Sequence, residues 1–266
     1  MSVGHLKVLV RGAGEIATAM ACRMAEARFH VVMTETDHPE AVRRRVAFSE
    51  VIYEKVKTVE GKVARLVDDY DGVMKCWENG EIAVIIDPEA KIKDQIHPDV
   101  EIDAIIAKKN LGTKMTDAEL VIGLGVGFEA GVDTHVVIET NRGHNLGRII
   151  RKGLADPDTG EPGNIAGYTY ERVLRAPCDG ILETDHDLGD IVKAGDIIGY
   201  VDGQPMKTVL SGVIRGLLRN GTKVHKGMKS GDVDPRGQVT YVDTISDKGR
   251  TISGGVLEAI MNHFNA

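Results

Sequence analysis

Apolar and polar residues are arranged along the first third of the chain in the order expected of an α/β domain. Two short β-prone apolar runs, 6–10 and 29–34, flank a stretch over 16–27 whose apolar residues recur on one helical face. Apolar runs without polar alternation suit the strands of a parallel sheet that is covered on both faces. The pattern therefore predicts strand, helix and strand, followed by more buried strands. These further runs are 82–86, 103–107, 120–124 and 136–140.

Turn and cap signals predict the elements between these strands. Residues 52–67 indicate a hairpin, because β-prone runs flank the dipeptide Glu60-Gly61. Segments with helical periodicity lie between such turns and the buried runs. Helices are expected over 68–79, over 41–48 with Pro39 suiting the first turn, and over 256–264 with Ser253 as the cap.

The first strand runs directly into a glycine turn with the spacing G-x-G-x-x-A, formed by Gly12, Gly14 and Ala17. In dinucleotide-binding proteins the first glycine permits a tight turn, the second lets the backbone approach a pyrophosphate, and the third small residue lets the helix pack closely. The helix N-terminus then offers N–H groups to a phosphate. Glu35 follows the second strand about 20 residues later, where such proteins place the acid that holds a ribose hydroxyl. The residues expected to bind a nucleotide here are Gly12, Ala13, Gly14, Glu15, Ile16 and Glu35.

Two features of this segment leave its ligand open. Glu15 places a carboxylate directly after the second glycine, where it would oppose a phosphate unless it points away. The motif is therefore either a nucleotide site or only a tight turn in a related domain whose ligand differs or is lost. Arg43, Arg44 and Arg45 are consecutive, so on a helix they cannot all face one ligand. We expect one of them, Arg43, to face a second anion beyond the second strand, the alternative being a solvated surface.

Polar residues and glycines follow the later strands, whose carboxyl ends should lie beside the ligand. Lys108 and Asn110 come after the run 103–107 and are either polar ligands or ordinary surface residues. The string from Gly123 to Gly131 has glycines at alternate positions, which indicates backbone brought close to a ligand or to another strand. The residues of this string expected at the ligand are Gly125, Gly127 and Phe128.

A further polar segment follows the strand over 136–140. Arg142 and His144 lie in it and either contact an anionic or polar ligand or belong to a structured turn. His135 and His144 stand on opposite sides of the strand and lack the spacing of a metal pair, so no metal is expected.

The last third of the chain is rich in glycine and repeats itself. Only 6 of the 31 glycines precede residue 112. The pattern around Gly180 recurs 32 residues later around Gly212, with short strands between glycine-containing turns. This duplication is similar to the barrel-sandwich hybrid of biotinyl and lipoyl carriers. Lys207 lies between the two copies, but it lacks the surroundings of a modified lysine, so neither biotin nor lipoate is expected.

Composition limits the classes of partner. The net charge of −7, without a basic run, argues against nucleic acid. No apolar stretch approaches the length of a membrane span and no signal peptide is evident, so we expect no membrane contact. Three widely separated cysteines without metal spacing are typical of reduced thiols, and a cytoplasmic location is expected.

With these strings assembled, the chain resembles the YqeB-like accessory proteins of the selenium-dependent molybdenum hydroxylase system. Val126 stands where that family would be expected to have proline. The resemblance implies a cytoplasmic role in maturing or supplying such enzymes, with a molybdoenzyme or its maturation factors as partners. It supplies no catalytic residue. The segments that carry the resemblance are 10–17, 44–50, 123–131, 138–147, 231–236 and 253–260.

The sequence thus predicts an α/β chain in three parts. A Rossmann-like parallel-sheet domain over 1–170 precedes a small β-rich domain over 171–245 that resembles a barrel-sandwich hybrid, and a C-terminal helix over 246–266 packs back on the first domain. The leading hypothesis is an accessory protein that binds NAD(P) or another nucleotide at the glycine turn. An NAD(P)-dependent oxidoreductase and a carrier or scaffold are the alternatives, and a homo-oligomer is compatible with all three.

Overall fold

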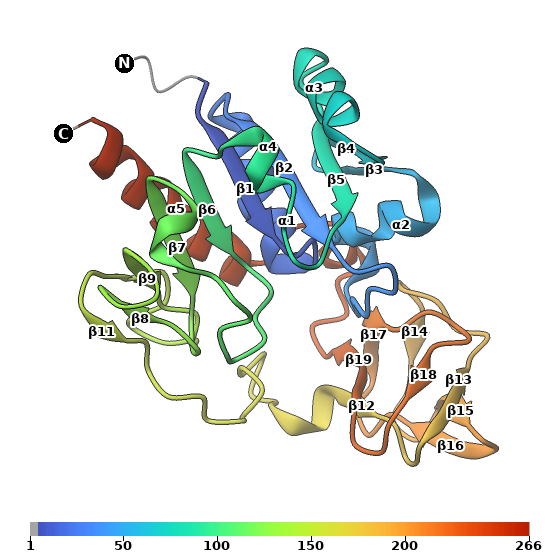
Figure 1. The fold of residues 1–266 in the computed structure, drawn as a ribbon. Coiled ribbons are helices and arrows are strands. Elements are labelled where there is room, and N and C mark those ends of the chain that lie inside the picture. Colours follow the sequence, from blue (N-terminus) through green and yellow to red (C-terminus); the bar gives the residue numbers. More distant parts are fainter. Residues whose placement is uncertain (1–4, 266) are drawn as a thin grey trace. The chain divides into compact units, whose positions relative to one another are not determined.

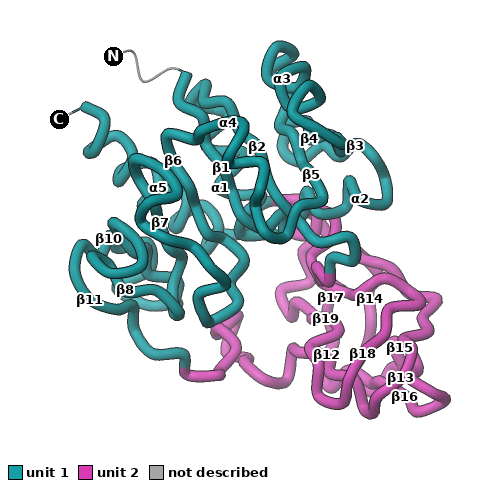
Figure 2. The backbone as a smooth tube through the Cα atoms, viewed as in Figure 1, with its two compact units in different colours: residues 1–39, 47–158, 245–266 teal, residues 40–46, 159–244 magenta. Residues whose placement is uncertain are grey.

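The chain forms two compact units in the computed structural model, which describes residues 5–265 (Figure 2). Unit 1 contains the described residues up to 39, residues 47–158 and those from 245 onward. Unit 2 contains residues 40–46 and 159–244. Unit 2 therefore begins before the expected boundary at 171, and it includes a short segment that the sequence assigned to the first domain.

Unit 1 is built on a nine-stranded sheet with the order β10-β9-β7-β6-β1-β2-β5-β4-β3 (Figure 1). All neighbouring strands are parallel except the two at the edges, β3 and β10. The next four strands in sequence, β2 to β5, lie on one side of β1. The later strands β6, β7, β9 and β10 lie on its other side. The strands are β1 (Lys7–Arg11), β2 (His30–Glu35), β3 (Val56–Val59), β4 (Lys62–Val67), β5 (Ile82–Ile86), β6 (Val100–Asp103), β7 (Leu120–Leu124), β9 (Val136–Ile138) and β10 (Ile149–Ile150), with the separate pair β8 (Glu129–Ala130) and β11 (Gly153–Leu154).

Helices cover both faces of this sheet. Helix α1 (Glu15–Glu26) packs against β1, β2 and helix α5 (Asp247–Phe264), which also contacts β7, β9 and β10. Helices α3 (Tyr70–Glu78) and α4 (Lys93–Ile96) share a buried cluster with Leu9 of β1. The short helix α2 (Val51–Glu54) precedes the hairpin of β3 and β4. Among the described residues, no helix is both long and apolar enough to cross a membrane.

Three sequence predictions of secondary structure are wrong. The strand expected over 103–107 lies instead over 100–103, where Glu101 and Asp103 interrupt the apolar pattern by which a buried strand is predicted. The helix expected over 41–48 is two short 3₁₀ turns, Arg44–Val46 and Phe48–Glu50. Helix α5 begins at Asp247, with Ser246 rather than Ser253 as its cap: the Ser246 hydroxyl accepts a bond from Gly249 N–H.

Unit 2 consists of two four-stranded sheets that contain the repeat seen in the sequence. Their orders are β12-β19-β17-β14 and β16-β15-β13-β18. Gly180 of β13 pairs with Val224, and the equivalent Gly212 of β17 pairs with Val192. Each copy therefore lends one strand to the sheet of the other. The strands are β12 (Val173–Arg175), β13 (Gly180–Glu183), β14 (Ile191–Val192), β15 (Ile197–Val201), β16 (Gln204–Lys207), β17 (Gly212–Leu217), β18 (Lys223–Val224) and β19 (Lys229–Asp234), and the turn η5 (Val239–Val242) follows them.

An apolar cluster of buried residues fills unit 2. Leu182, Val201, Ile214 and Val233 are fully buried in it. Lys207 lies on the strand β16 opposite Ile197. It is therefore not at a hairpin tip, which is where a carrier protein presents its modified lysine.

Candidate functional site

The glycine turn after β1 is the candidate site, and Gly12 is fixed there by the packing of unit 1. Its φ of +89° lies in the region that favours glycine. A Cβ at this position would also lie 3.2 Å from the carbonyl oxygen of Ala104 and from the Cα of Ile105. Its N–H donates to the carbonyl of Thr34 on β2. The protein's own backbone therefore explains why residue 12 is glycine.

Gly14 differs from Gly12, because nothing in the protein requires it to be glycine. Its φ of −67° and ψ of −174° are accessible to any residue. A Cβ built at Gly14 would meet no atom within 4 Å. The residue is the N-cap of α1, and within the described part of the chain the helix start has no side-chain cap hydrogen bond from this position. The turn therefore combines open space over Gly14 with the N–H groups of a helix start, an arrangement that suits an anionic group.

Glu35, at the end of β2, holds this turn in place. Its Oε2 accepts a hydrogen bond of 2.9 Å from the N–H of Ala13, and its Oε1 accepts one of 2.8 Å from the N–H of Thr36. The carbonyl of Ala13 in turn accepts a bond from Ser49 N–H. A ribose hydroxyl at Glu35 would have to share these oxygens, which have lone pairs to spare. Binding of ribose by Glu35 stays a prediction.

The predicted residues after β6 serve the loop in which they lie. Asn110 Oδ1 accepts bonds from the N–H groups of Gly112 and Thr113, and its amide donates to the Thr113 carbonyl. Lys108 is exposed, and its Nζ lies 2.5 Å from the carboxylate of Asp158. Asn110 therefore holds the loop in its conformation. A ligand at Lys108 would have to displace only the exposed carboxylate of Asp158.

The glycine string after β7 packs against protein. A Cβ at Gly125 would lie 2.2 Å from the hydroxyl of Thr140, and one at Gly127 would lie 2.7 Å from the backbone of Lys109. Phe128 is buried. Of the two interpretations that the sequence left open, close approach to other parts of the chain accounts for both glycines.

The predicted residues after β9 divide between a structured turn and a free surface. Arg142 forms two hydrogen bonds to Asp247 at the start of α5, at 2.5 and 2.8 Å. His144 is exposed. Glu139, which the sequence analysis did not single out, is buried and accepts bonds from the N–H groups of Asn141 and Asp156.

Arg43 belongs to unit 2 and is used inside it. Its side chain is buried, and its Nη2 donates to the carbonyls of Tyr241 and Thr244 at 2.9 and 3.0 Å. A guanidinium held in this way is a structural link between two segments of unit 2. It is not arranged as the expected contact for a second anion.

A buried charge cluster, which the sequence pattern did not predict, lies beside the glycine turn. Arg11, the last residue of β1, donates to the hydroxyl of Thr113, which donates to Asp103 at 2.7 Å. Glu101 is fully buried on β6, and neither of its oxygens has a hydrogen-bond partner among the described residues. Burial raises the pKa of Glu101 to about 7. The signal was two acids at alternate positions, 101 and 103, directly beside apolar residues.

No protein-family model matches the chain. It is 47% identical over 258 residues to the uncharacterized protein YqeB of Escherichia coli (strain K12), and the alignment covers 97% of this chain and 48% of that protein. The chain thus spans about half the length of the curated relative that it matches.

Solved structures give only distant likenesses. A succinylglutamate desuccinylase/aspartoacylase from Rhodobacter sphaeroides is 13% identical, with 86% of this chain and 85% of that chain covered, and has a TM-score of 0.27. The ectoine utilization protein EutE (DoeB) from Ruegeria pomeroyi is 14% identical, with 85% and 86% covered, and has a TM-score of 0.25. Scores this low carry no argument about fold or chemistry.

Proposed function

We propose that this chain is a YqeB-like accessory protein of selenium-dependent molybdenum hydroxylases, and that it binds a nucleotide-containing ligand at the turn of Gly12 and Gly14. The observation that carries the binding proposal is the open space over Gly14 at an uncapped helix start. A phosphate that approaches the backbone there accounts for a glycine that the protein's own packing does not require. The ligand proposed is NAD(P) or another nucleotide.

The sheet supports a Rossmann-like interpretation of unit 1. Strands are added on opposite sides of β1, so the turn lies at the carboxyl end of the strand where the sheet order reverses. Ligands of open α/β sheets bind in the crevice at such a point. The duplicated sheets of unit 2 likewise support a structural module related to the barrel-sandwich hybrid.

The role in hydroxylase maturation rests on the resemblance and on the identity to YqeB, a protein described only as uncharacterized. Within this role the chain would act in the cytoplasm, with a molybdoenzyme or one of its maturation factors as its partner. Deletion of the gene should lower the activity of the selenium-dependent hydroxylase in cells. Unchanged hydroxylase activity and selenium content in the deletion strain would rule the role out.

A Gly14→Ala variant tests the binding site. The side chain fits the fold but fills the space where a phosphate would approach, so affinity for the bound nucleotide should fall at least about tenfold. Isothermal titration of the full chain with NAD, NADP, NADPH and cytidine nucleotides measures this. Consumption of NADPH with a carbonyl or imine substrate would favour the oxidoreductase alternative.

Gly254→Ala is the matched control for this titration. Gly254 lies on α5 and also has no atom near a Cβ position, so the same change should leave affinity unaltered. If no nucleotide binds the wild-type chain, or if Gly14→Ala binds as tightly as wild type, the turn is architectural. The proposal would then fail.

A further inference from the structure

The loop over 104–113, which follows β6, lies beside the glycine turn. A Cβ at Gly12 would lie 3.2 Å from backbone atoms of this loop. Ile106 and Lys108 both have a φ of +59°, which residues other than glycine rarely adopt. The N–H groups of residues 106–109 have no hydrogen-bond partner within the described part of the chain. A backbone of this kind keeps its shape only where the surrounding structure holds it.

Arg11, at the end of β1, is buried and holds the far end of this loop. Its Nη2 donates to the carbonyl of Leu111 at 3.2 Å, and its Nη1 donates to the hydroxyl of Thr113. The same hydroxyl donates to Asp103 Oδ2 at 2.7 Å. Asp103 Oδ1 accepts a bond of 3.2 Å from the N–H of Ile105, at the near end of the loop. Two side chains at the ends of β1 and β6 thus hold both ends of the strained loop.

Glu101 lies beside Arg11 without a hydrogen bond to it. Its Oε1 is 4.0 Å from Arg11 Nη1, and the residue is fully buried. Neither of its oxygens has a hydrogen-bond partner among the described residues. An ionised Glu101 would therefore attract the guanidinium away from Thr113. The other charged groups around Glu101 are Asp103 of β6 and the ion pair of Lys93 with Asp117, whose charged atoms lie 2.7 Å apart.

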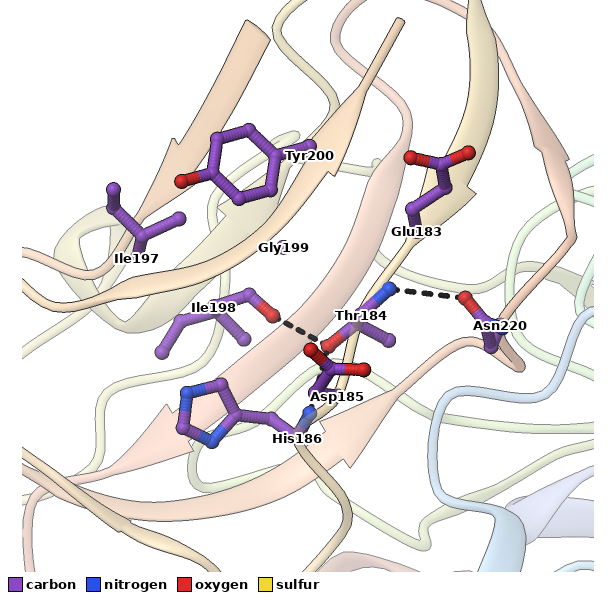
Figure 3. A pocket seen from close by; sticks show the side chains of 9 residues that line it. All are labelled: Glu183, Thr184, Asp185, His186, Ile197, Ile198, Gly199, Tyr200 and Asn220. Carbon is purple, nitrogen blue, oxygen red and sulfur yellow. Dashed lines mark hydrogen bonds between the residues drawn. The ribbon is translucent and has the colours of Figure 1, made fainter. Parts of the chain in front are cut away.

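The partners of Thr113 distinguish it from another threonine whose hydroxyl forms two hydrogen bonds. In the hollow of unit 2 shown in Figure 3, the Thr184 hydroxyl donates to the carbonyl of Ile198. It also accepts a bond from the N–H of His186. These partners are backbone groups, which do not titrate, whereas the partners of the Thr113 hydroxyl are charged side chains. The bond from Arg11 to Thr113 can therefore respond to a change of charge nearby.

We propose that Arg11 is a positioning residue for the ligand at the glycine turn: it holds the loop over 104–113 in place beside that ligand while Glu101 is uncharged. Ionisation of Glu101 draws Arg11 from Thr113 and Leu111, and the strained loop is released. Binding of the ligand and binding of a proton by Glu101 therefore favour each other. This coupling rests on the proposed nucleotide site, because its ligand is the nucleotide.

Calorimetric titration of the full chain with NAD tests the coupling, since the pyrophosphate of NAD stays ionised near neutral pH. Between pH 6 and pH 8, the affinity of the wild-type chain for NAD should fall about three- to tenfold. Titration in buffers of different ionisation enthalpy should show proton uptake when NAD binds above pH 7, which a merely structural role of Arg11 would not produce. Glu101→Gln should abolish both effects.

Two variants remove the contacts of the loop without removing a charge. Thr113→Val lacks the hydroxyl, and Arg11→Lys cannot donate to both Thr113 and Leu111. At pH 6 each variant should bind NAD as weakly as the wild-type chain does at pH 8. Thr184→Val is the matched control, because it removes a hydroxyl with two hydrogen bonds in unit 2, and it should bind NAD as the wild type does.

Trypsin reports on the loop without a ligand, because Lys108 and Lys109 are exposed in it. At pH 8, cleavage after these lysines should be about threefold or more slower in Glu101→Gln than in the wild-type chain. At pH 6, cleavage should be faster in Thr113→Val than in the wild type. Each comparison is made at one pH, so the pH dependence of trypsin itself cancels.

Failure of the coupling and failure of the nucleotide site give different results. If NAD binds with the same affinity at pH 6 and pH 8, or if Glu101→Gln and wild type are cleaved equally at pH 8, the coupling is overturned and the nucleotide site stands. A loss of affinity in Thr184→Val equal to that in Thr113→Val would also overturn it. If NAD does not bind the wild-type chain at either pH, the proposed ligand is wrong and the coupling fails with it.

Discussion

At the scale of single residues, the chain buries charged groups beside the glycine turn without giving each of their polar atoms a hydrogen bond. Arg11 donates to Thr113, which donates to Asp103, and Glu101 lies 4.0 Å from the Arg11 guanidinium, but neither oxygen of Glu101 has a hydrogen-bond partner among the described residues. Burial raises the pKa of Glu101 from 4.5 to about 7, because a carboxylate there loses its hydration. The folded chain therefore binds this proton more tightly than the unfolded chain does. The stability that this adds is complete below pH 4.5 and is lost as pH rises through 7, a difference of about 3 kcal/mol in all.

Glu101→Gln should remove this dependence on pH. Between pH 5 and pH 8, the free energy of unfolding of the wild-type chain should fall by about 2 kcal/mol relative to that of the variant. Urea denaturation at several pH values measures both. The exposed control Glu258→Gln should follow the wild type. Parallel pH profiles for wild type and Glu101→Gln would show that Glu101 does not titrate in this range.

Residue-scale roles could be predicted only where the partner was local. The spacing of Gly12 and Gly14 indicated the turn. It did not show that packing requires glycine at position 12 and not at 14, because this depends on Ala104, a residue far along the chain. The acids at 101 and 103 were a signal, but the burial of Glu101 could not be predicted from it, since it depends on β6 lying between β1 and β7 in the sheet. Local sequence therefore located the candidate site without showing which of its residues are held by packing.

At the scale of elements, the C-terminal helix shows how close packing overrides helix propensity. Gly249 and Gly255 argue against a helix in sequence, yet α5 includes both. A Cβ at Gly249 would lie 2.9 Å from Ala19 of α1, and one at Gly255 would lie 2.2 Å from the carbonyl oxygen of Gly147. These glycines let α5 approach its neighbours. The apolar pattern predicted a helix only over 256–264, after these glycines, whereas α5 begins at Asp247.

Adjacent glycines of α5 should therefore respond in opposite ways to alanine. Gly255→Ala places a methyl group against backbone that cannot move aside, and it should lower the free energy of unfolding by about 2–4 kcal/mol. Gly254→Ala meets no atom within 4 Å and should raise it by about 0.5–1 kcal/mol, the ordinary gain for alanine in a helix. Urea denaturation of the two variants tests this. Stabilisation by both changes would mean that α5 is not packed this closely.

At the scale of the whole molecule, unit 2 is completed by a segment from the N-terminal part of the chain. Three consecutive arginines fasten this segment. Arg43 binds the carbonyls of Tyr241 and Thr244, Arg44 binds Leu217 and Asp187, and Arg45 binds Leu188. Arg44 and Arg45 both lie beside Asp187, and Arg45 also contacts Asp243, so the partners of the three arginines are protein carbonyls and two carboxylates. Such long-range partners leave no local pattern, so the duplication of unit 2 could be predicted while its noncontiguous make-up could not.

Arg43→Gln should therefore weaken unit 2 selectively. The shorter side chain leaves the partly buried hydrogen bonds to the carbonyls of Tyr241 and Thr244 without their donor, which should cost about 1–3 kcal/mol. Hydrogen exchange measured by mass spectrometry should accelerate in peptides from β12 to β19 and stay unchanged in peptides from β1 and β2. Arg148→Gln, an exposed change in unit 1, should alter neither set. Equal acceleration in both units would instead show that the two units open together, and it would contradict a role of Arg43 that is confined to unit 2.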